Sequence, residues 1–264
     1  MSTTIQDIID SMIEAVPGAP RVDSVDTVKC GDPAQPVTGI VTTFTATMDV
    51  LRQAVQLGAN LIITHEPTFY DHRDHTDWLG DDPVYQRKRD FLEQNQLAIW
   101  RYHDYWHMQR PDGIITGLLR QLGWEQYYQP DQRVLAIIPE MTLETLVAHL
   151  KEKLAMPTVR IVGNPQQSCQ RLGLMVGAAG GTRQIEVFQK LDVDVLLCGE
   201  TIEWQTCEYV RDANALGYNK ALVILGHAKS EEDGMRYLAD WLRSRVPATI
   251  PITYIAVGNP TLAI

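Results

Sequence analysis

The sequence has few of the features that mark secreted, membrane or disulfide-bonded proteins. Its 264 residues include only four cysteines, with no closely spaced CxxC pair: Cys30, Cys169, Cys198 and Cys207. Such isolated cysteines are typical of reduced thiols in a cytosolic protein. The apolar runs are far shorter than the roughly 20 residues that a membrane helix needs. The first residues lack the basic and apolar regions of a signal peptide. We therefore expect a cytoplasmic protein without a membrane partner.

Basic charge and phosphate-binding motifs are also scarce. Lysine and arginine total 23 against 33 aspartates and glutamates, which gives a formal net charge of −10. This acidic balance argues against a nucleic-acid partner, which would need basic patches. The glycine-rich stretch at 177–181 matches neither GxGxxG nor GxxxxGK[ST], so we interpret it as a tight turn. A small molecule is the expected substrate.

What the sequence does contain is a regular alternation of helical and strand-like segments. Apolar residues recur at helical spacing over residues 5–16, and the run 59–63 is typical of a buried parallel strand. Further strand-like runs lie at 38–45, 97–102, 134–138, 158–162, 172–176, 193–197, 221–225 and 252–257. Helical segments separate most of them, which predicts an α/β fold with mostly parallel sheets. We place one domain at residues 1–128 and a second at 129–264.

Histidines follow three of the strand-like runs. His65, His103 and His227 each occur where an apolar run stops. In α/β sheets the carboxyl ends of the strands face the binding crevice. Glu231 lies four residues after His227 at the start of a long helical segment, a spacing that places both on one helical face. His107 also lies four residues after His103.

These histidines and the nearby carboxylates predict a metal site. With Glu66 they form a set of imidazoles and carboxylates that suits Zn, Mn, Fe or Ni, as in two-metal hydrolytic sites. A lone histidine at a strand end is more often a hydrogen-bonded structural residue, but the repetition of the pattern favours a site. Glu200 also ends a strand and is expected to contact a substrate or orient a ligand.

The sequence points less strongly to a functional role for four other ionisable residues. His72 and His75 belong to a polar loop and are expected to be exposed, with a lid as the alternative. Arg101 and Lys229 lie near strand ends. Each is either a contact for a phosphate group or a surface charge.

Several segments resemble the NIF-three-like dinuclear-metal family, whose bacterial members are often labelled GTP cyclohydrolase I type 2. They occur in the family's order over nearly the whole chain: Ala59-Asn60-Leu61-Ile62-Ile63-Thr64-His65-Glu66-Pro67, Tyr102-His103, Cys198-Gly199-Glu200 and Gly226-His227-Ala228-Lys229-Ser230-Glu231. The resemblance implies two interlinked α/β domains with a cleft between them that holds two divalent ions. It also implies that about 220–264 pack back on the first domain, and that six chains form a toroidal homo-hexamer.

The resemblance assigns ligands and also reveals two departures. His65 fits the first histidine of the family's His-His pair, and His227 and Glu231 fit its C-terminal ligands. His103 fits the histidine of the family's His-Thr-Asn-x-Asp segment. The second histidine of the pair is Glu66 here, and the final aspartate of the segment is His107. We interpret the two exchanges as compensating, with Asp104 as an alternative ligand.

The function expected from this set is that of a metal-dependent hydrolase. Two divalent ions lower the pKa of a shared water, and Glu66 or Glu200 could act as the general base. The family labels suggest ring opening of a purine nucleotide such as GTP. One alternative is a non-catalytic metal-binding or regulatory toroid. Another is a protein-interaction scaffold.

Overall fold

The computed structural model describes residues 2–261. These residues form two compact units, each built around its own β-sheet. The first unit comprises the described residues through Ile114 together with Gly234–Val257, and the second comprises Ile115–Asp233 and the described residues from Gly258. Helix α9 (His227–Arg243) therefore begins in the second unit and ends in the first.

The sheet of the first unit is mainly parallel. Its strands lie in the order β1-β4-β3-β2-β10, and only the β1–β4 pairing is antiparallel. The bounds are β1 (Val28–Cys30), β2 (Ile40–Thr43), β3 (Leu61–Thr64), β4 (Ala98–Arg101) and β10 (Ile252–Tyr254). The associated helices are α1 (Ile5–Glu14), α2 (Met48–Gln56), α3 (Pro83–Gln94) and α4 (Asp104–Met108).

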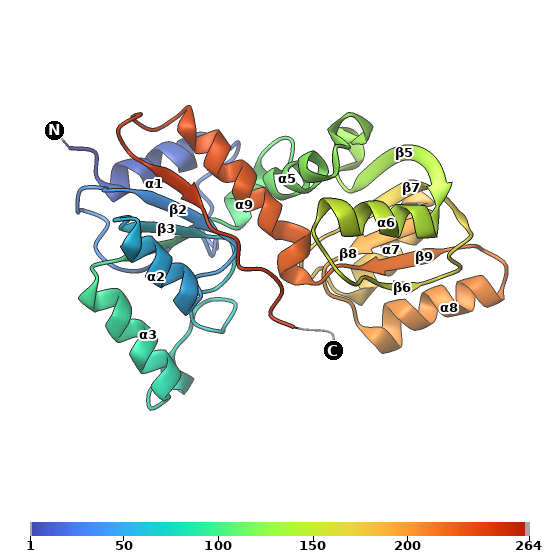
Figure 1. Ribbon diagram of the computed structural model, residues 1–264, viewed down its shortest axis with the longest axis horizontal. Helices are drawn as coiled ribbons and strands as arrows, with labels where there is room; N and C mark the ends of the chain where they lie inside the picture. The colour runs from blue at the N-terminus through green and yellow to red at the C-terminus, as the bar shows by residue number, and fades with distance from the viewer. Residues whose placement is uncertain (1, 262–264) are drawn as a thin grey trace. The chain divides into compact units, whose positions relative to one another are not determined.

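Helices cover both faces of this sheet (Figure 1). One face carries a core to which α2 and α3 contribute, and this core includes Leu51, Ile62 and Leu92. On the opposite face Thr42 donates a hydrogen bond to the backbone oxygen of Met235 in α9. All residues of β2, β3 and β4 are buried. This explains why these strands, apart from Arg101 at the end of β4, are continuous apolar or β-branched runs rather than alternating ones.

The second unit has a mixed sheet in the order β5-β7-β8-β9-β6. The pairings β7–β8 and β8–β9 are parallel, whereas β5 and β6 pair antiparallel at the two edges. The strands are β5 (Leu135–Thr142), β6 (Arg160–Val162), β7 (Ser168–Met175), β8 (Val195–Cys198) and β9 (Ala221–Ile224). The helices are α5 (Gly113–Leu122), α6 (Leu143–Lys153), α7 (Gly181–Leu191) and α8 (Glu208–Ala215). Side chains of α5 and α6 share one core with this sheet, and those of α7 and α8 share another.

The predicted α/β class with mostly parallel sheets is confirmed, and the differences are local. Two elements were not predicted: β1, because three residues inside a polar loop carry no periodic signal, and α4, because it has only five residues. The helical segment between β8 and β9 begins as a π-helix, Glu203–Cys207, before α8. No helix in the described part of the chain is both long and apolar enough to cross a membrane.

The glycine-rich stretch is a tight turn that packs against a carboxylate. Gly177 has a φ of +66°, and a Cβ at this position would collide with the carboxylate of Glu231. Gly199 is equally constrained, because its Cβ would meet the backbone oxygen of Gly177. These glycines allow close backbone approach beside Glu231.

Thr47 gives a direct test of how α2 is started. Its side chain accepts a hydrogen bond from the backbone N–H of Val50, which is the contact of an N-cap residue. Thr47→Ala should lower the free energy of unfolding by about 1 kcal/mol, measured by urea denaturation. Thr47→Ser keeps the hydroxyl and should retain most of that stability. Equal stabilities for the alanine and serine variants would contradict this role.

Candidate metal centre

Two of the predicted histidines follow neighbouring parallel strands. Thr64 at the end of β3 pairs with Arg101 at the end of β4, so the chain leaves both strands at the same edge. His65 follows β3 directly, and His103 lies two residues beyond β4. Their rings are stacked with centroids 4.5 Å apart, and His65 is fully buried.

The third imidazole comes from the short helix α4. The backbone N–H of His107 donates to the oxygen of His103 at 3.1 Å, which places the two side chains one helical turn apart. The ring centroid of His107 is 5.0 Å from that of His103 and 5.1 Å from that of His65. One ring nitrogen from each histidine lies within 4.8 Å of the others, close enough for all three to bind one ion.

Two of these rings each contact a carboxylate through Nδ1. His103 Nδ1 lies 2.9 Å from Asp104 Oδ1, and His107 Nδ1 lies 2.9 Å from Asp112 Oδ2. The contact with His103 holds the pKa of Asp104 well below its usual value. Because the carboxylates engage Nδ1, Nε2 of each ring is the nitrogen left to bind a metal, the arrangement common in metalloproteins. Asp104, the alternative ligand in the sequence analysis, thus contacts a ligand.

Glu66 lies beside the three imidazoles and is held by a buried arginine. Its Oε1 is 3.7 Å from His103 Nε2, and its Oε2 is 3.3 Å from the guanidinium of Arg101. Arg101 is fully buried and also donates to the backbone oxygens of His65 and His72. The proposed roles of Arg101 as a phosphate contact or a surface charge are therefore wrong, because its donors are used inside the protein.

A residue that the sequence analysis missed holds the start of α4. Asp26 is buried, and its carboxylate accepts hydrogen bonds from the backbone N–H groups of His103, Asp104 and Tyr105 at 2.8–3.0 Å. These are first-turn donors that the helix itself cannot satisfy. Burial raises the pKa of the Asp26 carboxyl, and the three donors act in the opposite direction. Asp26 occurs in a polar loop where no local pattern distinguishes it from neighbouring aspartates.

The remaining predicted residues form a second group, in the second unit. His227 opens α9, and its Nε2 lies 3.1 Å from Glu231 Oε2, as the four-residue spacing predicts. Its Nδ1 lies 2.9 Å from Glu200 Oε1, so Glu200 orients the ring. Lys229 donates to the carboxylate of buried Glu232 at 2.5 Å, which argues against its predicted alternatives of a phosphate contact or a surface charge.

The predicted site residues therefore come from both units of the structure. The imidazole group, which we define as His65, His103 and His107 with Glu66, belongs to the first unit. His227 and Glu231, with Glu200 beside them, belong to the second. His72 and His75 are exposed, as expected for a polar loop.

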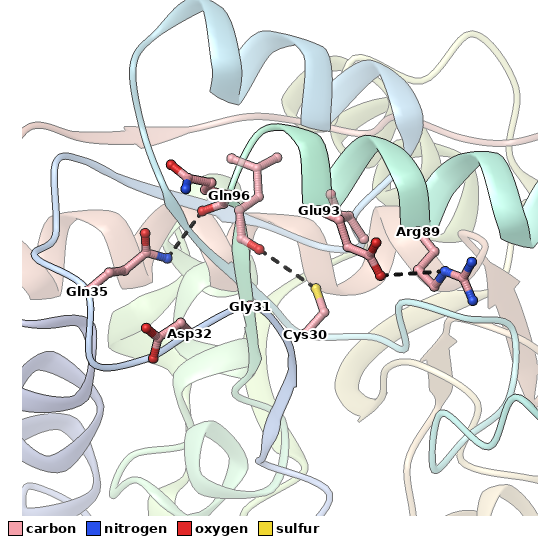
Figure 2. A pocket seen from close by; sticks show the side chains of 9 residues that line it. Cys30, Gly31, Asp32, Gln35, Arg89, Glu93 and Gln96 are labelled. Carbon is pink, nitrogen blue, oxygen red and sulfur yellow. Dashed lines mark hydrogen bonds and ion pairs between the residues drawn. The ribbon is translucent and has the colours of Figure 1, made fainter.

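A pocket elsewhere in the first unit shows no comparable chemistry (Figure 2). It has a volume of about 410 Å³ and lies between Cys30 and the end of α3. Among its polar groups, Arg89 pairs with Glu93 at 3.6 Å, and the side chain of Gln35 donates to the backbone oxygen of Gln96. Burial raises the pKa of the Cys30 thiol to about 11, so this cysteine is not poised as a nucleophile.

Known proteins resemble this chain in sequence and in fold. It is 23% identical to a GTP cyclohydrolase 1 type 2 homolog of Clostridium perfringens over 230 residues, which cover 83% of each chain. It is 25% identical to a protein of the same name from Escherichia coli K12 over 231 residues, covering 84% of this chain and 85% of that one.

Solved structures resemble this chain in fold over its full length. A Bacillus cereus protein related to NIF3 matches with a TM-score of 0.80, 16% identity and 100% coverage of both chains. A hypothetical protein of Staphylococcus aureus matches with a TM-score of 0.76, 21% identity and the same coverage. At these identities the structures establish the fold alone. The model of the family Duf34/NIF3 (NGG1p interacting factor 3) matches residues 3–260, and the chain therefore belongs to this family.

Proposed function

We propose that the protein is a metal-dependent hydrolase that acts on a small molecule. The observation that carries the proposal is the imidazole group, in which three histidines place ring nitrogens within 4.8 Å of one another. Such a cluster is costly to assemble without a function, because each ring gives up hydration to lie against the others. Imidazole suits Zn, Mn, Fe and Ni.

The residues fit a resident metal in both donor type and orientation. His65, His103 and His107 would hold the ion. The carboxylates of Asp104 and Asp112 fix which nitrogens of His103 and His107 are presented. Glu66 adds an oxygen ligand of the kind that accompanies imidazole in hydrolytic sites.

In the second unit, His227 and Glu231 would hold a second ion, and Glu200 would orient His227 in the same way. This assignment follows the family resemblance. The histidine and the carboxylate are already in contact at 3.1 Å, so little rearrangement is needed for both to approach one cation. The proposal therefore predicts two ions per chain.

A bound divalent ion would supply Lewis-acid activation of water or of the substrate. The chain's own contribution to the reaction is proton transfer and charge placement. Glu66 is positioned to accept a proton from water beside His103, while Arg101 holds the other carboxylate oxygen. Glu200 is a second candidate base, because more than half of its side chain is exposed.

The substrate class to test first is taken from the names of the relatives. Because the relatives are named GTP cyclohydrolase 1 type 2 homologs, GTP is the first substrate to test. Purified protein should contain about two transition-metal ions per chain by elemental analysis. Chromatography of GTP incubated with the loaded protein should then show loss of the intact purine ring.

The metal analysis and the GTP assay distinguish the proposal from its alternatives. A protein that remains metal-free after incubation with Mn, Fe and Zn would contradict the proposal. Bound metal without turnover of GTP, other nucleotides or small amides would favour the alternative, a non-catalytic metal-binding or regulatory toroid. Assembly into a homo-hexamer is part of both versions, and light scattering of the purified protein measures it directly.

A further inference from the structure

A second pocket of the first unit lies next to Glu66. Its volume is about 540 Å³, and it is lined by residues 45–48 at the start of α2, by most of 66–72, and by Lys88. Glu66 belongs both to this pocket and to the imidazole group. A ligand in the pocket would therefore have one end close to the candidate metal ligands.

The wall of this pocket contains a buried ammonium group with no counter-ion in contact. Lys88 is only 4% exposed, and its Nζ donates to the backbone oxygen of Thr68 at 2.6 Å. Among the described residues no carboxylate forms an ion pair with it, and its other close neighbours are the rings of Phe69 and Tyr70. An ammonium has three donors. Burial lowers the pKa of Lys88 to about 8, an effect that the negative charge of Asp74 offsets only in part.

The carboxylate of Asp74, the nearest candidate counter-ion for Lys88, already makes other contacts. Asp74 pairs with Lys29 at 3.4 Å, and its Oδ1 accepts hydrogen bonds from the backbone N–H groups of Thr68 and Phe69 at 2.7 Å. Buried lysines are rare unless they are paired. The structure therefore leaves a cation in the pocket wall that an anionic ligand could neutralise.

Two further features of the wall favour an anion. The hydroxyl of Thr68 is buried and has no hydrogen-bond partner within the described chain. The pocket is also lined by the N-terminal end of α2, a helix of nine residues, where the first backbone N–H groups lack partners inside the helix. Lys88, Thr68 and the start of α2 thus line one cavity, and each carries a group that can donate to an oxyanion.

We propose that this pocket binds the oxyanion group, phosphate or carboxylate, of a small-molecule ligand, with Lys88 as the principal contact. The inference rests on the proposed function in one respect: the ligand is the molecule that the imidazole group acts on. It goes further by requiring that this molecule carry a negative charge. Glu66 at the other border of the pocket would exclude a second anionic group unless a metal neutralised it.

The test uses the full chain stripped of metal and titrated with inorganic phosphate, or with acetate, by calorimetry. The wild-type protein should bind at least one of the two, and the tighter one identifies the oxyanion. Lys88→Met, which keeps the length of the side chain but removes the charge, should bind about 10- to 100-fold more weakly. Arg87→Met removes an exposed charge next to it in α3 and should bind like the wild type.

Equal affinity in the wild-type and Lys88→Met proteins, or no binding of either anion by the wild type, would overturn the inference. If Lys88→Met does not fold, Thr68→Val takes its place. That variant loses a hydroxyl without a protein partner, so it should fold and bind the anion several-fold more weakly, and wild-type affinity would overturn the proposal. Metal content is measured separately and should be normal in every variant, so failure of the anion site and of the metal site are distinguishable.

Discussion

His103→Ala should weaken the binding of a divalent transition metal by about 100-fold or more. His103 stacks on His65 and contacts His107, so its removal takes away the central imidazole of the group. Loss of a residue that merely orients a ligand costs roughly 10- to 100-fold in metal affinity, and loss of a ligand should cost at least as much. Competition with a chelating dye measures the effect on purified, refilled protein.

Two variants make this result specific. His75→Ala removes an imidazole whose side chain is 70% exposed, and it should leave metal affinity unchanged. Asp112→Asn keeps the shape of the side chain next to His107 and should weaken binding by about 10-fold. If His103→Ala bound metal as tightly as His75→Ala does, the imidazole group would not be the metal site.

Asp26→Ala should lower the free energy of unfolding by about 3 kcal/mol, the largest loss of stability among the changes considered. The variant leaves three backbone N–H groups at the start of α4 without their acceptor, and a buried hydrogen bond contributes roughly 1 kcal/mol. Asp26→Asn keeps one acceptor oxygen, which can still serve His103 and Asp104, and should cost about 1 kcal/mol. Urea denaturation of the metal-free proteins measures both.

The position of α4 adds a second readout to this experiment. Because His103 and His107 are held by the start of α4, Asp26→Ala should also weaken metal binding in protein that remains folded. Asp23→Ala, in the same loop but exposed, should change stability by less than about 0.5 kcal/mol. Equal stabilities of Asp26→Ala and Asp23→Ala would show that the hydrogen bonds to α4 do not hold the helix in place.

Local patterns were sufficient to predict most elements that carry the site. A buried parallel strand is a continuous apolar run, so β3 and β4 were visible in the sequence, and each ends close to its histidine. The four-residue spacing of His103 and His107 matches one helical turn, although the five-residue helix α4 itself was not predicted. These inferences worked because strand burial and helical period act over a few neighbouring residues.

The partners of those residues depended on the tertiary structure. Asp26 lies 77 residues from His103, and the β1–β4 pairing helps to bring its loop beside α4. Arg101 looked like a candidate phosphate ligand, yet chain folding buries it under Glu66 and His72. Whether a charged side chain meets water or a protein partner is decided by segments far away in the sequence.

The sequence by itself thus determined the α/β class, the strand ends at which chemistry could occur, and the imidazoles that meet there. Only the tertiary structure decided which carboxylates hold His103 and His107, and which cation borders the pocket beside Glu66. Lys88 illustrates the difference: its place in a polar helix predicts nothing unusual, yet folding buries it against Phe69 and Tyr70. Hydrophobic periodicity is a local property, whereas electrostatic complementarity is a property of contacts between distant segments.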